Sequence, residues 1–417
     1  MLAAQERIVT DANKTTVPTT LIEGKPNEYP AFDAVEIAKD IEIGYGICPA
    51  DVNGDGKLDV VVADAQQFWW FENPTWKKHA LTTKGATRAH NVAIAPGDLD
   101  GDGKVDFAAG ADWQINNTKS GGDVLWLRRG ADVYQPWDVI PVAQEPTTHR
   151  VALADIDGDG KQEIINVPLL GKNSTKAKNW MDAPIRVLAY KPPKDPAKEP
   201  WKEVVLNESL HVAHGFDVVK WPHVLAREQL VGSILVSSYN GIQIVTPGSG
   251  SPWISPRLGE GNQIGADNAL TKPNPSLGAG EVRLGRLAGN KRCIATIEPW
   301  HGHQAIAYLE TKEGELWHRH VIDDSGMWGH GLACAKISSK DFDDIIVGYR
   351  DASKDRGKPA IAAYVPLAAD GSKWRKHILD EGVAVEALCV ADFNGDGKLD
   401  IAAAGRATHN VKLLIQK

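Results

Sequence analysis

The stretch Asp51-Val-Asn-Gly-Asp-Gly-Lys-Leu-Asp59 decides the fold of this chain, because three further segments repeat it with few changes. These segments span residues 98–106, 155–163 and 392–400. Each copy carries oxygen-bearing side chains at alternate positions, bends at glycine and ends on a carboxylate, which is how a short loop wraps around a hard cation. The repetition predicts a repeat architecture.

Each acidic loop also predicts a structural Ca²⁺ or Mg²⁺ site, with ligands at its first, third, fifth and ninth positions. The expected ligands are Asp51, Asn53, Asp55 and Asp59; Asp98, Asp100, Asp102 and Asp106; Asp155, Asp157, Asp159 and Glu163; and Asp392, Asn394, Asp396 and Asp400.

A second repeat sets the number of units. An aromatic residue opens a short β-like segment seven times, at Phe32, Trp76, Trp137, Trp201, Trp253, Trp317 and Trp374. Between these landmarks a unit has an apolar strand, an acidic turn and two further apolar strands, such as residues 60–64 and 68–71. Four short strands per unit, repeated radially, predict an all-β fold, a seven-bladed β-propeller.

The two ends of the chain are expected to close the ring. The last unit supplies only three strands, whereas the segment 32–37 stands alone before the first complete unit. This N-terminal strand is predicted to complete the last blade, which leaves the ring without a free sheet edge. We expect an N-terminal extension over residues 1–18 and one propeller over residues 19–417.

The composition disfavours several classes of function. The net charge is −8 with no basic block, which argues against nucleic acid as a partner. No run of about 18 apolar residues occurs, so no membrane span is expected. The four cysteines lie in apolar strands without a C-x-x-C spacing and are expected to be buried free thiols. Small residues at the N-terminus could remain from a signal peptide, and weak Ca²⁺ loops suit a periplasmic or secreted protein.

The start of each inner strand is expected to face the central channel at one mouth. Tyr45 lies six residues before its acidic loop. The equivalent position in the other blades follows from counting back from their acidic loops or, where a blade has none, from aligning the inner strands. His90 lies two residues further back, which keeps its facing but moves it about 6–7 Å along the strand. The predicted ring is Tyr45, His90, His149, His214, Glu281, His330 and Glu386. Imidazoles that converge with a carboxylate on one axis suit Zn²⁺.

Loops between second and third strands are expected at the same mouth. The densest spans residues 298–303, and its His301 and His303 could join the pore ligands or bind sugar hydroxyls. Aromatic rings beside hydrogen-bonding groups suit a carbohydrate, which presents both C–H faces and hydroxyls. The candidate substrate-binding residues are Trp113, Lys172, Tyr239, Trp300, Trp328, Arg350 and Arg406. A G-x-S-x-G elbow, an H-E-x-x-H helix and a Gly-rich phosphate loop do not occur.

Two resemblances follow from these motifs. The acidic loops resemble FG-GAP or VCBS repeats, the blades of integrin α-subunit heads and of many exported bacterial proteins. The segment 148–160, the following residues 166–171 and the pore histidines are similar to the propeller domain of the aldos-2-ulose dehydratase/isomerase family. That family acts on keto-sugars and holds zinc in its propeller cleft. No counterpart of its cupin and lectin-like domains occurs in this sequence, so only the propeller's share of the chemistry carries over.

The second resemblance implies a metal-dependent dehydratase or lyase. Its reaction would be β-elimination on a keto-sugar such as 1,5-anhydrofructose or a 3-keto-glycoside. The implied zinc ligands are His149, His214 and His330, or Glu281 in place of one of them.

The resemblance also implies catalytic roles for the remaining pore residues. Whichever of Glu386 and Glu281 does not bind the metal is the candidate base. Tyr45 or His90 would protonate the leaving oxygen.

Two other functions remain open at this point. A polysaccharide lyase acting on uronate-containing glycans would need Arg350, Arg406 or Lys172 to neutralise a carboxylate. A propeller that only binds a carbohydrate or a protein would need no pore metal.

Overall fold

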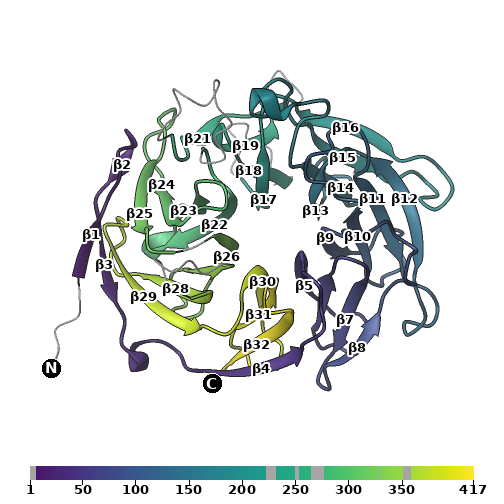
Figure 1. Ribbon diagram of the computed structural model, residues 1–417, viewed down its shortest axis with the longest axis horizontal. Helices are drawn as coiled ribbons and strands as arrows, with labels where there is room; N and C mark the ends of the chain where they lie inside the picture. The colour runs from purple at the N-terminus through teal and green to yellow at the C-terminus, as the bar shows by residue number, and fades with distance from the viewer. Residues whose placement is uncertain (1–5, 222–231, 249–252, 264–276, 327, 351–357) are drawn as a thin grey trace.

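The computed structural model describes residues 6–221, 232–248, 253–263, 277–326, 328–350 and 358–417. Its strands form seven sheets arranged radially around a central channel, as Figure 1 shows, which confirms the predicted propeller. Short 3₁₀ turns lie at Pro26–Glu28, Lys176–Lys178 and Ala288–Asn290. No helix in the described ranges is long and apolar enough to cross a membrane.

Each blade runs from an inner strand at the channel to an outer strand at the rim. The first blade consists of β5 (Gly46–Ala50), β6 (Asp59–Ala63), β7 (Phe68–Glu72) and β8 (Lys77–Ala80). The second consists of β9 (Ala93–Gly97), β10 (Asp106–Ala111), β11 (Asp123–Arg128) and β12 (Asp138–Gln144). The third consists of β13 (Thr148–Ala154), β14 (Glu163–Pro168), β15 (Val187–Lys191) and β16 (Lys202–Asn207).

The later blades carry additions at their outer edges. The fourth consists of β17 (Ala213–Lys220), β18 (Gly232–Ser238), β19 (Gly241–Pro247), β20 (Trp253–Ile254) and β21 (Arg257–Gly259). The fifth consists of β22 (Glu281–Leu287), β23 (Lys291–Glu298), β24 (Gln304–Leu309), β25 (His318–Asp323) and β2 (Thr16–Val17). The sixth consists of β26 (Gly329–Ala335), β27 (Asp344–Tyr349), β28 (Ala360–Pro366), β29 (Lys373–Asp380), β3 (Thr19–Glu23) and β1 (Glu6–Val9).

The seventh blade closes the ring with strands from both ends of the chain. It consists of β30 (Val385–Ala391), β31 (Asp400–Gly405), β32 (Asn410–Gln416) and β4 (Phe32–Ala38). β4 pairs antiparallel with β32, with Val35 opposite Leu413. This pairing confirms the predicted closure by the N-terminal strand.

The blades are held together by apolar side chains between neighbouring sheets. Every residue of β6 and of β31 is buried, because a blade is covered on both faces by the blades beside it. Of the tryptophans in the outer-strand slot, Trp374 is fully buried and Trp137 and Trp317 nearly so, whereas Trp76, Trp201 and Trp253 are half-buried. Aromatic side chains of this size supply much of the buried apolar area.

The topology divides the ring into two functional faces. The acidic loops follow the ends of inner strands such as β5 and β13, and so they lie on one face. The inner strands begin on the opposite face, where the loops from second to third strands also emerge. The candidate site therefore lies on the face opposite the acidic loops.

Candidate active site

A cavity of about 940 Å³ opens at the mouth where the inner strands begin. Its polar and aromatic lining comes from all seven blades and their connecting loops. The lining residues of these kinds are Tyr45, Trp113, His149, His214, Trp300, His301, His303, Trp328, His330, Arg350, Glu386 and Arg406. The cavity thus gathers most of the residues that the sequence places at this mouth.

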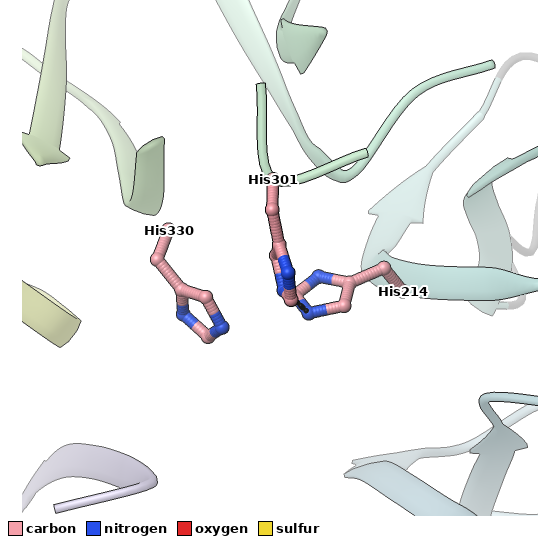
Figure 2. Close-up of side chains that lie close together, drawn as sticks. All are labelled: His214, His301 and His330. Atoms are coloured by element: carbon pink, nitrogen blue, oxygen red, sulfur yellow. Dashed lines mark hydrogen bonds between the residues drawn. The ribbon is translucent and has the colours of Figure 1, made fainter. Parts of the chain in front are cut away.

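Three imidazoles meet at the inner end of the cavity. His214 stands in β17, His330 stands in β26, and His301 comes from the loop between β23 and β24. One ring nitrogen from each lies within 4.8 Å of those from the other two. Nε2 of His301 lies 2.6 Å from Nε2 of His214, and Figure 2 shows both rings turned toward one another with His330 beside them. At this distance one imidazole donates an N–H hydrogen bond to the ring nitrogen of the other.

His149 lies next to this group and lines the same cavity. Its Nδ1 is 3.1 Å from the backbone carbonyl oxygen of His214, and its Nε2 is 3.4 Å from Nη1 of Arg150. The three rings that meet are those of His214, His330 and His301, and His301 was expected as a possible further pore ligand. The two histidines in the short loop around His301 were the signal in the sequence for a site here. The direction of the His301 side chain depends on contacts with distant residues, which no local sequence pattern reveals.

The histidines of this cluster are held in the neutral form. Burial lowers the pKa of His214, and burial together with the nearby arginines and histidines keeps the pKa values of His301 and His330 well below the usual range. A neutral imidazole has a lone pair free for a metal ion. Nδ1 of His330 contacts the backbone carbonyl oxygen of Glu386, which leaves Nε2 as its nitrogen on the cavity side.

Glu281 lies behind His214, in a deeper channel cavity of about 310 Å³. Its Oε1 is 2.9 Å from Nδ1 of His214 and 3.2 Å from Nη2 of Arg150. Burial alone would raise the pKa of Glu281, but Arg150 and His214 outweigh it and bring the pKa to about 2. An ionised carboxylate at this distance favours the His214 tautomer that carries its proton on Nδ1.

Glu386 belongs to the main cavity and is surrounded by positive charge. Its two oxygens lie 3.2 Å from Nη1 of Arg350 and 3.0 Å from Nη1 of Arg406. Its Oε1 is also 3.8 Å from Nε2 of His330. This carboxylate is 2% exposed, so the two guanidinium groups hold it against the histidine cluster.

Tyr45 and His90 form a hydrogen-bonded pair, 3.2 Å from the hydroxyl oxygen to Nδ1. Tyr45 is buried and lines the cavity, whereas His90 is exposed and does not line it. Burial raises the pKa of Tyr45, which keeps the phenol protonated. The pair can pass a proton between solvent and the cavity.

The aromatic candidates divide into those at the cavity and those behind it. Trp113, Trp300 and Trp328 line the cavity, and Trp328 is 45% exposed. Tyr239 does not line it, but packs behind Trp300 at 6.3 Å between ring centroids. Lys172 is exposed and is not part of the lining.

Comparison with known proteins places these features in context. Residues 121–313 match the family model described as "Aldos-2-ulose dehydratase, beta-propeller domain". Residues 51–109 match an FG-GAP-like repeat, and residues 384–409 match an FG-GAP repeat. The chain is a seven-bladed propeller that has segments similar to FG-GAP repeats and resembles, over residues 121–313, the propeller domain of aldos-2-ulose dehydratase.

A curated relative, aldos-2-ulose dehydratase from Phanerodontia chrysosporium, is 21% identical over 299 residues. The alignment covers 68% of this chain but only 32% of the relative, so the chain spans about a third of that protein's length. Within the segment matched by the aldos-2-ulose dehydratase propeller model lie His149, His214, Glu281 and His301. His330 lies beyond it in the sixth blade, and Glu386 lies beyond it in the seventh.

Solved structures with the same shape support the fold alone. A chain in a crystal structure of the mitotic checkpoint complex aligns with a TM-score of 0.51 and 11% identity, covering 94% of this chain and 96% of that chain. BBS1N in complex with ARL6DN aligns with a TM-score of 0.50 and 12% identity, covering 94% of this chain and 97% of that chain.

The FG-GAP loops are organised by their own carboxylates. Asp51 accepts hydrogen bonds from the backbone amides of Gly54 and Gly56 at 2.8 and 2.9 Å. The buried carboxylate of Asp59 accepts one from the amide of Val52 at 2.9 Å, and the other loops repeat this bond. Carboxylate oxygens converge within 4.8 Å in two loops, at Asp98, Asp100 and Asp106 and at Asp155, Asp157 and Glu163. Oxygen groups of this kind fit Ca²⁺ or Mg²⁺.

Proposed function

We propose that this propeller is a metal-dependent carbohydrate lyase that removes a β-substituent from a keto-sugar. The observation that carries the proposal is the cluster of His214, His301 and His330 at the inner end of an aromatic-lined cavity of about 940 Å³. The similarity to the aldos-2-ulose dehydratase propeller supports the same class of reaction. Water would be the product released from a free sugar, and an alcohol or sugar would be released from a glycoside.

The residues present fit a zinc-class ion. Three imidazoles whose burial keeps them neutral are a donor set typical of catalytic zinc, with one position left for substrate or water. Glu281 holds His214 from behind, as second-layer carboxylates do at histidine metal sites. When bound, such an ion supplies a Lewis acid that polarises a sugar carbonyl.

Glu386 is the group best placed to accept the proton from the carbon next to that carbonyl. It lines the cavity beside His330, and it lacks the inward ion pair that holds Glu281 against His214. Arg350 and Arg406 fix the direction of its carboxylate and add positive charge where negative charge develops on the substrate.

Tyr45 is the group proposed to protonate the leaving oxygen. The C–O bond to the β-substituent breaks as the C–C double bond forms, so that oxygen needs one proton. Tyr45 keeps its proton because burial raises its pKa, and His90 can return one from solvent afterwards. The indole faces of Trp113 and Trp300 would pack against the sugar and exclude water.

An elimination assay tests this function. Purified protein is incubated with a 3-keto-glycoside or with 1,5-anhydrofructose, and the conjugated ketone is followed by its ultraviolet absorbance. We expect product with the wild type, none after treatment with a chelator, and recovery when Zn²⁺ is returned. His330→Ala should abolish the reaction, whereas His79→Gln, a histidine in the outer strand β8, should leave it unchanged. Absence of product from every keto-sugar tested, with metal bound, would contradict the proposal.

A uronate-specific lyase is the second candidate, because Arg350 and Arg406 both line the cavity. In that case a uronate-containing glycan would be cleaved and the neutral keto-sugar would not. Saturable binding of a sugar without turnover would instead support a propeller that only binds carbohydrate.

A further inference from the structure

The loop that carries His301 is fastened at both of its ends by one buried side chain. The loop spans residues 299–303, between Glu298 at the end of β23 and Gln304 at the start of β24. Arg319 of β25 donates from Nε to Oε2 of Glu298 at 2.8 Å. It also donates from Nη2 to Oε1 of Gln304 at 2.8 Å. One planar guanidinium thus binds the side chains of both residues that flank the loop, which are themselves paired across β23 and β24.

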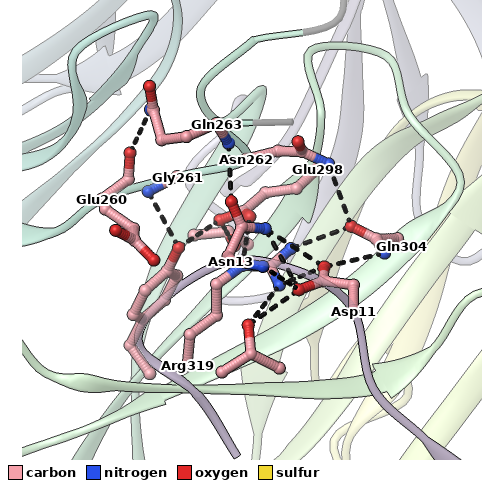
Figure 3. A network of polar contacts seen from close by, with 12 residues as sticks. Asp11, Asn13, Glu260, Gly261, Asn262, Gln263, Glu298, Gln304 and Arg319 are labelled. Atoms are coloured by element: carbon pink, nitrogen blue, oxygen red, sulfur yellow. Dashed lines mark hydrogen bonds and ion pairs between the residues drawn. The ribbon is translucent and has the colours of Figure 1, made fainter. Parts of the chain in front are cut away.

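The remaining donors of Arg319 bind the N-terminal segment. Nη1 donates to the Asp11 carboxylate and, at 3.1 Å, to Oγ1 of Thr16. Asp11 also accepts a hydrogen bond from Nε2 of Gln304 at 3.2 Å, so it contacts one end of the loop directly. Figure 3 shows Asp11 and Asn13 arriving from the N-terminal segment and meeting Arg319, Gln304 and Glu298.

Further contacts hold the N-terminal segment over this network. The amide of Arg319 donates to the carbonyl oxygen of Thr15 at 3.0 Å. The amide and hydroxyl of Thr15 donate to Oε1 of Glu260 at 3.1 and 2.7 Å. The amide of Gln263 donates to Oδ1 of Asn13 at 2.8 Å. Residues 11–16 therefore cover the guanidinium and separate it from water.

Burial makes the network sensitive to the loss of any member. Arg319 and Glu298 have side chains that are 0% exposed, and that of Asp11 is 8% exposed. Oε1 of Glu298 also accepts hydrogen bonds from the hydroxyls of Thr296 and Tyr308, each at 2.8 Å. Removing one partner from a buried charge network leaves the others unpaired in a poorly solvated place, so the chain must rearrange around them.

The loop packs closely against Glu298, so the position of His301 depends on the position of Glu298. A Cβ at Gly302 would lie 2.2 Å from the carbonyl oxygen of Glu298, so the loop folds tightly onto the residue that Arg319 holds. His301 has a left-handed backbone with φ of 51°, a strained conformation that persists only where its surroundings impose it. Its ring stacks on Trp300 at 4.8 Å between centroids. A shift of Glu298 therefore moves or releases His301.

We propose that Arg319 is a positioning residue for His301, and that residues 11–16 are a component of the candidate active site rather than an appendage of the propeller. Arg319 contacts neither the cavity nor the histidine cluster; it acts through Glu298 and Gln304. The expected effect of Arg319 on metal binding rests on the proposed function, whereas its expected effect on the order of the loop 299–303 does not.

Three variants test the proposal in the full chain. Asp11→Asn keeps the shape of the side chain but removes its charge. Arg319→Lys keeps the charge but cannot bind Glu298 and Gln304 at once. Gly302→Ala displaces the loop directly and serves as the positive reference. The matched control is Tyr29→Phe, which removes a 2.9 Å hydrogen bond to the buried carboxylate of Asp344 at the acidic-loop face.

Two measurements separate positioning from general loosening. Hydrogen exchange followed by mass spectrometry reports on the peptide that contains residues 299–303. Titration with Co²⁺ alone reports on the histidine cluster through the visible absorption of the bound ion. We expect Asp11→Asn and Arg319→Lys to accelerate exchange in that peptide and to weaken Co²⁺ binding by about 10-fold or more, with an altered spectrum, as second-layer changes do. Tyr29→Phe should change neither.

The outcomes distinguish this proposal from the proposed function. Unchanged exchange in both Asp11→Asn and Arg319→Lys would overturn it, and so would equal acceleration in Tyr29→Phe. If Arg319→Lys does not fold, Asp11→Asn alone decides. Faster exchange in a protein whose wild type binds no Co²⁺ would support the positioning role while contradicting the metal-dependent function.

Discussion

Nε2 of His301 lies 2.6 Å from Nε2 of His214, although the two residues are 87 positions apart and belong to adjacent blades. His214 stands on an inner strand, whereas His301 reaches the same point from a loop. Burial lowers the pKa of both rings, so each is neutral, and one of them donates a hydrogen bond to the other. The candidate chemistry of this propeller depends on that contact.

Glu386→Gln should lower kcat by about 10²–10⁴-fold, the range typical for loss of a general base, while the metal content stays the same. The amide cannot accept the substrate proton but keeps the shape that Arg350 and Arg406 surround. Glu310→Gln, at an exposed ion pair with Arg292 on the fifth blade, is the control and should leave kcat unchanged. A Glu386→Gln enzyme with wild-type kcat would remove this residue from the mechanism.

Two tryptophans should respond in opposite ways to replacement by alanine. Trp374→Ala should lower the free energy of unfolding by about 3–5 kcal/mol, because the side chain is fully buried between blades. Trp328→Ala should change stability little, since this side chain is 45% exposed, but should raise KM because it lines the cavity. Chemical denaturation and steady-state kinetics measure the two effects. A large loss of stability in Trp328→Ala with unchanged KM would argue against a substrate-binding role.

The stability of the protein should fall below about pH 4 through Asp323. Burial alone would raise the pKa of Asp323, but Lys376 and the hydroxyls of Ser325 and Tyr364 outweigh it and bring the pKa to about 2 from its ordinary value of 3.8. The folded state then binds fewer protons than the unfolded state between these values. The contribution of Asp323 to the free energy of unfolding is therefore present above about pH 4 and is lost as the pH falls to about 2.

Thermal unfolding of wild type and Asp323→Asn over this pH range checks the assignment. The variant should have a lower Tm near neutral pH and a flatter acid limb. Asp324→Asn is the control, because the Asp324 side chain is 42% exposed. Parallel acid limbs in wild type and Asp323→Asn would assign the pH dependence to other carboxylates.

Adding Ca²⁺ should raise the Tm of the protein. An ion that binds only the folded state stabilises it by about 2.7 kcal/mol at 100 times its Kd. The gain should shrink in Asp98→Asn and Asp155→Asn, whose loops bring three carboxylates together, and should persist in Asp33→Asn, a side chain that is 66% exposed. Scanning calorimetry with Ca²⁺ and with a chelator measures the difference. An identical Tm with Ca²⁺ and with the chelator would contradict Ca²⁺ binding by these loops and would indicate that their backbone hydrogen bonds alone hold them.

The architecture was predictable because it repeats. Acidic loops and tryptophans recur at comparable spacings, and the unpaired segment at residues 32–37 revealed how β4 closes the ring. The mouth of the channel could be located by counting back along inner strands, since period-two alternation fixes which side chains face the axis. His214, His330 and Glu386 all lie at the cavity found there.

The parts of the site that were not predictable depend on contacts distant in sequence. Arg319 and Asp11, which contact the two ends of the loop that carries His301, are 308 positions apart. No spacing within the loop encodes that contact. The sequence likewise did not indicate the contact between Nδ1 of His149 and the backbone carbonyl oxygen of His214.

Elemental analysis of purified protein tests the central claim most directly. Wild type, His301→Ala and the outer-strand control His79→Gln are compared by inductively coupled plasma mass spectrometry. We expect about one zinc-class ion per chain in wild type and His79→Gln, and its loss in His301→Ala with any loop-bound Ca²⁺ retained. A wild type without transition metal, or a His301→Ala variant that keeps its full complement, would contradict it.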